Sequence, residues 1–97
     1  MYGSLRRYSV TPGSSTEAIQ RVQEGFVPLV RQVPGFISYT VLELPGDVLL
    51  SLSVFEDEDA AVESNRVAGN WVPANIGKFI KGLPQIMEAT VVVHEEK

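Results

Sequence analysis

The sequence contains no cysteine and only one histidine, His94. Without cysteine the chain forms no disulfide and offers no thiolate, either as a nucleophile or as a ligand for zinc or iron–sulfur clusters. A single histidine also excludes the HExxH motif and every site that needs several imidazole ligands. We therefore expect no metal site in this protein.

Long apolar runs and an excess of positive charge are missing as well. No apolar run approaches the ~18 residues of a membrane-spanning helix, and residues 1–7 lack the apolar core of a signal peptide. We therefore expect a cytoplasmic protein that does not enter a membrane. Eight basic residues stand against twelve acidic ones, for a net charge of −4. This balance argues against nucleic acid as a partner.

The 97 residues suit one globular domain, which we expect to span residues 1–97, because 44% of them are hydrophobic and 21% are charged. Four short segments rich in β-branched and apolar residues are predicted strands, namely residues 5–10, 36–44, 48–55 and 86–94. Pro45-Gly46-Asp47 is a turn that joins the second and third strands into a hairpin.

A first helix is predicted between the first two strands. Ser14 and Glu17 have capping-box spacing, which places the helix start there. Apolar residues then recur at intervals of three and four up to Val33, and Pro34-Gly35 ends the helix. Pro28 removes a backbone donor inside the helix, so we expect a kink or local break at this point.

A second helical region is predicted to begin at the acidic run of residues 56–59. Carboxylates favour a helix N-terminus because of the helix dipole; a magnesium or calcium site is the alternative, although no EF-hand spacing follows. Gly69-Asn70 is expected to interrupt this helix near Ala68. A further segment with Pro73 in its first turn would then reach Ile80, and Gly82-Leu83-Pro84 would close the element.

The element order β-α-β-β-α-β predicts an α+β, ferredoxin-like fold with a four-stranded antiparallel sheet. Right-handed crossovers place both helices on one face of this sheet. The other face would then be an exposed apolar surface, because the third strand carries Leu50, Leu52 and Val54 on one side and Leu49 and Phe55 on the other. A second copy of the sheet is the simplest cover, so we predict a homodimer.

Several motifs occur in an order typical of one family. They are Val33-Pro34-Gly35-Phe36 before the second strand, the strand-to-helix segment Ser53-Val54-Phe55-Glu56-Asp57-Glu58-Asp59-Ala60-Ala61, Trp71, and a valine-rich last strand. Together they resemble the antibiotic biosynthesis monooxygenase family of dimeric α/β barrel proteins, over about residues 4–94.

This resemblance implies a dimeric α/β barrel with a pocket between sheet and helices in each subunit. Some members oxidise phenolic or anthrone-type compounds with O2 and without metal, flavin or haem; others degrade haem, and many have no known activity. Two positions depart from the family pattern. Phe55 stands where better-understood members often have tryptophan, and the region of residues 57–81 lacks the histidine expected of haem-degrading members.

Three residues are the candidate catalytic residues. Asn65 shares an apolar helical stripe with Ala61 and Ala68, so its amide either donates to a substrate oxygen or bonds backbone at the helix break. Trp71 either forms an aromatic wall for a planar ligand or anchors the core or a dimer contact. Histidine is the side-chain type whose ordinary pKa suits a base near neutral pH, so His94 is a candidate base, but its position near the chain end also suits an exposed or interface residue.

Five further residues are candidates for substrate binding: Arg66, Asn75, Tyr39, Ser51 and Ser53. Arg66 is either a ligand for an acidic substrate or a surface residue paired with a carboxylate. Arg6 and Tyr8 lie on one face of the first strand and Arg7 on the other. One of these arginines is expected in a buried or dimer-facing position, with Glu43 or Glu88 as its partner.

The function expected from these features is cofactor-independent oxidation of an aromatic or quinol-type small molecule with O2. Such chemistry needs a base, donors that hold the substrate anion and a dry pocket. The alternative is a non-catalytic module of the same fold that binds a small hydrophobic molecule, and haem degradation is the less favoured third reading.

Overall fold

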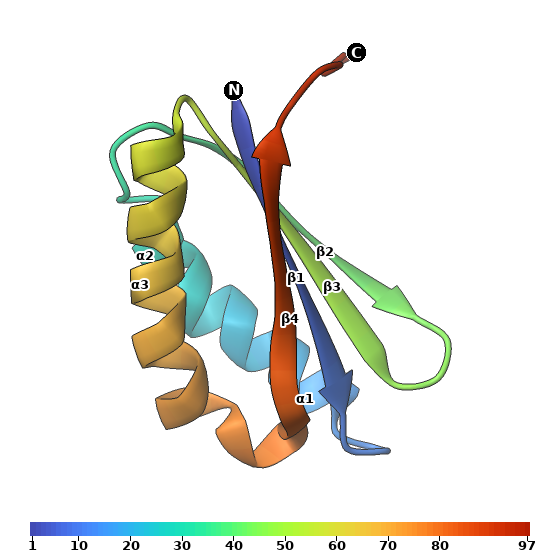
Figure 1. The fold of residues 1–97 in the computed structure, drawn as a ribbon. Coiled ribbons are helices and arrows are strands. Elements are labelled where there is room, and N and C mark those ends of the chain that lie inside the picture. The colour runs from blue at the N-terminus through green and yellow to red at the C-terminus, as the bar shows by residue number, and fades with distance from the viewer.

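The computed structural model describes all 97 residues and confirms the order β-α-β-β-α-β. One antiparallel sheet has the strand order β2-β3-β1-β4. Its strands are Tyr2–Val10 (β1), Phe36–Leu44 (β2), Val48–Phe55 (β3) and Ile80–Thr90 (β4). Figure 1 shows that the helices all cover one face of this sheet and that the two termini lie at the same end. This is the predicted ferredoxin-like α+β fold.

The first helical region contains the expected irregularity just before Pro28. It consists of α1 (Ser15–Arg21), a π-helical turn η1 (Val22–Phe26) and α2 (Val27–Val30). The Val27 amide bonds to the carbonyl of Val22, five residues back. Because Pro28 has no N–H, the carbonyl of Glu24 loses its α-helical partner, and a widened turn accommodates this loss. The helix ends at Val30, earlier than predicted.

The predicted capping box at the start of α1 is wrong. Ser14 is the N-cap residue, but its side chain makes no capping hydrogen bond, and its backbone angles of φ −102° and ψ −6° are helical. A side-chain cap normally requires an extended N-cap residue. Glu17 instead pairs with Arg21 one turn along, at 2.9 Å.

The predicted interruption at Gly69-Asn70 is also wrong, because α3 runs without a break from Glu58 to Asn75. Pro73 lies inside this helix and leaves the carbonyl of Gly69 without an amide donor. Gly69 is exposed, so water can satisfy this carbonyl. Near the helix end the Asn75 side chain donates to the carbonyl of Trp71 at 2.8 Å. Because the helix is continuous, residues spaced by three and four share one face from its first turn to its last.

The last strand begins and ends earlier than the predicted residues 86–94. β4 starts at Ile80, directly after the short 3-10 helix η2 (Gly77–Phe79). The pairing with β1 shifts between Arg7, opposite Gln85, and Ser9, opposite Lys81. Gly82-Leu83-Pro84 therefore forms a β-bulge rather than a helix terminator, with Gly82 at φ +73°. Because β4 ends at Thr90, His94 lies beyond the sheet.

Strand alternation divides the sheet into a helix-covered face and an open face. The buried side chains of β1 are Ser4, Arg6, Tyr8 and Val10, and those on the same face of β3 are Leu49, Ser51, Ser53 and Phe55. The open face carries Leu42, Leu52 and Met87, which are 52%, 42% and 50% exposed. The hydrophobic core thus lies between the sheet and the helices. None of the helices has the length and apolarity needed to cross a membrane.

The π-helical turn approaches α3 closely at Gly25. A Cβ atom on Gly25 would lie 2.8 Å from Cζ2 of Trp71, closer than carbon atoms pack. Phe26 contacts the same indole ring, with a centroid distance of 5.5 Å. Glycine at this position therefore allows the π-helical turn to pack directly against Trp71 of α3.

The start of α3 gives a first prediction. The Asp57 side chain accepts a hydrogen bond from the Ala60 amide at 2.9 Å. We expect Asp57→Ala to lower the free energy of unfolding by ~1 kcal/mol, because this cap is lost. Asp59→Ala, in the same turn but without a capping bond, should cost less. Urea denaturation of both variants checks this, and equal losses would contradict the capping role.

The contact between Gly25 and Trp71 gives a second prediction. Gly→Ala within a helix ordinarily stabilises by about 0.5–1 kcal/mol. Gly69→Ala in α3, where a Cβ meets nothing within 4 Å, should show this gain. Gly25→Ala should instead destabilise and shift the Trp71 fluorescence, because the indole must move. Equal stabilisation by both substitutions would refute the close contact.

Candidate functional site

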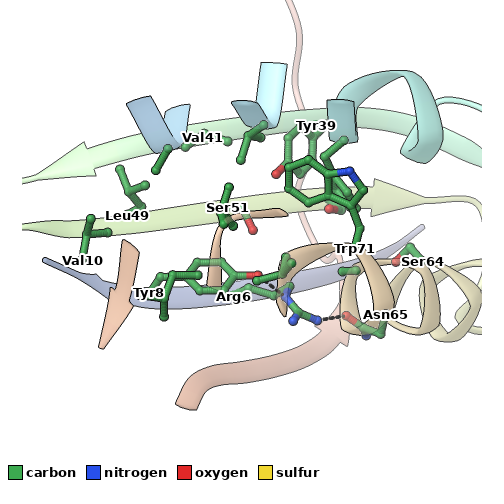
Figure 2. Close-up of a pocket in the computed structure, with 18 residues that line it drawn as sticks. Arg6, Tyr8, Val10, Tyr39, Val41, Leu49, Ser51, Ser64, Asn65 and Trp71 are labelled. Carbon is green, nitrogen blue, oxygen red and sulfur yellow. Dashed lines mark hydrogen bonds between the residues drawn. The ribbon is translucent and has the colours of Figure 1, made fainter. Parts of the chain in front are cut away.

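A narrow, mostly apolar cavity lies between the sheet and the helices (Figure 2). Its free volume is about 30 Å³, and 13 of its 18 lining residues are hydrophobic. Side chains from β1, β2 and β3 form its floor, and side chains from α1, η1 and α3 cover it. This volume is about two to three times the ~10–15 Å³ that a cavity needs to hold one water. A ring-sized ligand therefore needs one lining side chain to move.

Polar side chains gather around Arg6 on the β1 side of the cavity. Arg6 is 7% exposed. Its Nε donates to the Tyr8 hydroxyl at 2.6 Å, and its Nη1 donates to Oδ1 of Asn65 at 3.0 Å. Figure 2 shows the guanidinium held between these two side chains. The guanidinium is thus fixed in place by neutral groups on β1 and α3.

Asn65 links this arginine to two further polar residues. Its Oδ1 also accepts from the Ser4 hydroxyl at 3.2 Å, and its Nδ2 donates to the Glu88 carboxylate on β4. The buried arginine predicted on β1 is therefore Arg6, but the prediction of Glu43 or Glu88 as its direct partner is wrong. Asn65 stands between the guanidinium and Glu88, because Glu88 lies on the edge strand at the exposed surface.

Tyr39 and two serines supply hydroxyl groups from the neighbouring strands. Burial raises the pKa of the Tyr39 phenol well above its ordinary value, and the nearby Tyr8 raises this pKa further. Hydrogen bonding to Ser51 acts in the opposite direction but does not reverse the shift. Tyr39 therefore stays protonated at neutral pH. Ser51 and Ser53 are 5% and 6% exposed and also line the cavity.

Trp71 separates the cavity from the outer surface. Its half-buried indole lines the cavity and also borders a shallow outer groove beside Leu29 and Asn70. Phe26 lies 5.5 Å from Trp71 and 5.5 Å from Tyr39 by ring centroids, so three aromatic rings meet at this end. Trp71 is thus the large lining side chain whose movement would open the cavity to the groove.

Of the eight residues predicted to form the site, five line the cavity: Asn65, Trp71, Tyr39, Ser51 and Ser53. The structure does not bring the other three to it. Arg66 is exposed and pairs with Glu63 at 2.5 Å, which lowers the pKa of Glu63. Asn75 bonds the Trp71 carbonyl at the exposed end of α3. His94 lies in the C-terminal segment, where its Nε2 is 3.2 Å from Glu96.

Arg6 and Tyr8 are cavity residues that the sequence analysis placed on one strand face without assigning them to the site. The available signal was alternation, because Arg6 and Tyr8 share their face with Val10, an apolar residue suited to the core. Alternation alone does not say which face the helices cover. The structure settles this point, since Val10 is 2% exposed beneath the helices.

Solved structures share this fold at low sequence identity. A protein of unknown function from Nitrosomonas europaea is 16% identical at a TM-score of 0.80, over 99% of this chain and 93% of that one. A Streptomyces coelicolor monooxygenase in complex with nanaomycin D is 17% identical at 0.79, over 99% and 91%. A MhuD variant with two manganese protoporphyrin IX molecules per active site is 17% identical at 0.79, over 100% of both chains. These identities show the fold alone.

The sequence itself also matches a family model. No curated protein gives a significant match to the chain. The model described as antibiotic biosynthesis monooxygenase matches residues 1–66, which is more than half of the chain and includes β1, β2, β3 and the first half of α3. The chain therefore belongs to the antibiotic biosynthesis monooxygenase family.

Proposed function

We propose that this protein is a cofactor-independent monooxygenase that oxidises an aromatic or quinol-type small molecule with O2. Membership of the family supports a monooxygenase-type role. The observation that carries the proposal is the cavity: it is largely apolar, closed by aromatic side chains, and polar where Arg6, Tyr8 and Asn65 meet. Such a site excludes water and holds a flat molecule with a polar substituent.

This reaction needs few catalytic groups from the protein. An electron-rich ring loses a proton to form an anion, which reacts directly with O2. In the oxidation of an anthrone-type methylene to a carbonyl, one oxygen atom enters the product. The other leaves as water, with both hydrogens supplied by the methylene. Pre-positioned donors that hold the substrate anion, together with a dry cavity, lower the barrier to this reaction.

The proposal assigns different tasks to the lining residues. Trp71 closes the cavity and provides a flat wall for the ring. Tyr39 remains a hydroxyl donor because of its raised pKa. Asn65 has its amide oxygen engaged by Ser4 and Arg6 and its nitrogen engaged by Glu88. We therefore assign Asn65 the positioning of Arg6, in place of the two roles weighed from the sequence, which were donation to a substrate oxygen and a bond to backbone at the helix break.

One feature of the cavity favours the alternative of a binding module without turnover. No carboxylate and no imidazole are among the lining residues, so the cavity lacks an ordinary general base. His94, the candidate base, lies in the C-terminal segment beside Glu96. Haem degradation has the least support, because neither a histidine nor space for a porphyrin is found at the cavity.

We also propose that the protein is a homodimer formed through the open face of the sheet. Leu42, Leu52 and Met87 are each 42% or more exposed there. Leu5 lies between the last two in register, opposite Leu52 on one side and Met87 on the other. Together with Leu50, which lies opposite Leu42, these side chains make one apolar surface across all four strands. A second copy of the same surface would remove it from water.

The oxygenase proposal predicts O2 uptake by purified, metal-stripped protein with a panel of anthrones and hydroquinones. We expect Asn65→Ala to lower the catalysed rate at least about tenfold, because removal of a polar group that organises the site costs this much or more. Trp71→Ala should also lose rate, since water then enters the cavity. An oxygen electrode measures both.

Gln23→Ala is the control, because it removes an amide side chain from an exposed position of the helical layer. Its rate should equal that of the native protein, and Trp71→Phe should restore part of the rate lost in Trp71→Ala. Uptake no faster than the uncatalysed reaction across the panel would count against the oxygenase and in favour of the binding module.

The dimer proposal predicts a mass of about twice 10.6 kDa by light scattering at micromolar concentration. Leu52→Glu should shift the mass toward the monomer, because it places a charge in the proposed interface. Val62→Glu, on the exposed side of α3, should leave the mass unchanged. A native protein that is monomeric at this concentration would rule the interface out.

A further inference from the structure

Arg6 is the single charged side chain among the residues that line the cavity. It is 7% exposed, and a guanidinium keeps its charge at any ordinary pH. A buried charge is normally paired with an opposite charge, because removal from water is costly. The three ion pairs of the protein, Arg21–Glu17, Arg66–Glu63 and His94–Glu96, do not include Arg6.

The partners of Arg6 within the protein are neutral. Its Nε donates to Tyr8 and its Nη1 donates to Asn65, which uses two of the five N–H groups of a guanidinium. Nη2 has no hydrogen-bond partner in the protein, and no fully enclosed side-chain nitrogen lacks one. Nη2 therefore keeps some exposed surface, and the guanidinium of Arg6, a lining residue of the cavity, retains unpaired donors for a ligand.

The hydroxyl groups near Arg6 add donors rather than acceptors. Because the Tyr8 oxygen accepts from Arg6, its own hydrogen is available for another acceptor. Tyr39 stays protonated and provides a second phenolic donor. No carboxylate lines the cavity to offer a competing negative charge. This part of the cavity thus matches an oxygen atom that carries negative charge.

We infer that Arg6 binds the anionic oxygen group of an aromatic ligand, either a carboxylate or an ionised ring hydroxyl, while the ring lies among the apolar residues beside Trp71. This inference rests on the small-molecule site of the proposed function. Where the bound group is an ionised ring hydroxyl, the inference also accounts for the missing general base, because the ring already carries the negative charge that a base would otherwise have to create. Arg6 is then the residue that decides which ligands bind.

Glu88 is the competing explanation for the charge of Arg6. Its carboxylate accepts from Nδ2 of Asn65 and so lies one side chain away from the guanidinium. Glu88 is exposed, and water screens most of the field of an exposed carboxylate. Glu88 therefore orients the Asn65 amide, with its oxygen toward Arg6, and leaves the guanidinium free to bind an anion.

The test compares anionic aromatic ligands with neutral molecules of similar shape. One pair is benzoate and benzamide, and the other is pentafluorophenolate and pentafluoroanisole. Binding to the full protein is followed by NMR through the indole N–H of Trp71, which gives one signal because the chain has one tryptophan. The first pair tests a carboxylate and the second an ionised ring hydroxyl.

We expect the anion of at least one pair to bind about tenfold or more tightly than its neutral counterpart, because a charge-assisted hydrogen bond replaces a neutral one. Arg6→Gln, which keeps donors but removes the charge, should erase this preference. Arg31→Gln, which removes one positive charge from an exposed position, is the matched control and should keep it.

A second variant keeps Arg6 and moves the nearby carboxylate from position 88 to position 65. In the double variant Asn65→Asp with Glu88→Gln, one carboxylate is retained but moves next to Nη1 of Arg6, in a side chain of nearly the same shape. The anion preference should be lost while the fold is preserved. Glu88→Gln alone should keep the preference, because the guanidinium stays free.

Equal binding of anion and neutral molecule in both pairs, or no binding of any of the four, would overturn the inference. An equal loss of preference in Arg6→Gln and Arg31→Gln would overturn it too, because the effect would then be long-range. O2 uptake on the same samples separates this inference from the proposed function. Uptake without an anion preference overturns the role of Arg6 alone, whereas an anion preference without uptake overturns the oxygenase and leaves the ligand class standing.

Discussion

A guanidinium buried beneath helices needs acceptors that no regular strand supplies, since the backbone carbonyls of a sheet are already paired. In this protein Arg6 has the Tyr8 hydroxyl and the Asn65 amide as acceptors. This arrangement requires three different elements to be placed correctly. β1 must turn the face of Arg6 toward the helices, α3 must present Asn65 in the correct phase, and β4 must bring Glu88 to the outer side of Asn65. The polar part of the cavity therefore depends on the packing of the whole domain.

The closeness of the helical layer determines how much space remains beside this cluster. Gly25 lets the π-helical turn contact Trp71, and Phe26 fills the space between Trp71 and Tyr39. The result is a cavity of about 30 Å³ with the indole between it and the outer groove. π-helical turns occur often at functional sites, and this one arises where Pro28 removes an amide donor. The same irregularity thus shapes the helix and positions the wall of the site.

Local sequence signals predicted some elements well and others poorly. β2 and β3 have the predicted bounds, because alternating residues and the Pro45-Gly46-Asp47 turn specify a hairpin within a short stretch. Gly69-Asn70 and Gly82-Leu83-Pro84 have the composition of helix breaks, yet tertiary packing carries α3 through the first and sheet pairing makes a bulge of the second. Such outcomes depend on partners that are distant in the sequence.

The residues of the site were likewise predicted only in part. Helical spacing places Asn65 on an apolar stripe with Ala61 and Ala68, and this stripe holds because α3 is continuous. Trp71 is a candidate for a different reason, as an aromatic residue of the family motif. Arg66 follows Asn65 directly and so points elsewhere, and His94 lies outside the sheet because β4 ends at Thr90. The burial of Arg6 was not predictable in the same way. Alternation defines two faces of β1, but only the assembled fold determines which one the helices cover.

The most direct test of this account is a crystal structure of the protein with bound benzoate. We expect the carboxylate to accept hydrogen bonds from Arg6, with the ring in the cavity and the Trp71 indole displaced toward the outer groove. Benzoate bound only on the outer surface, with Arg6 and Trp71 in their present positions, would contradict the claim that this cavity is a site for anionic aromatic molecules.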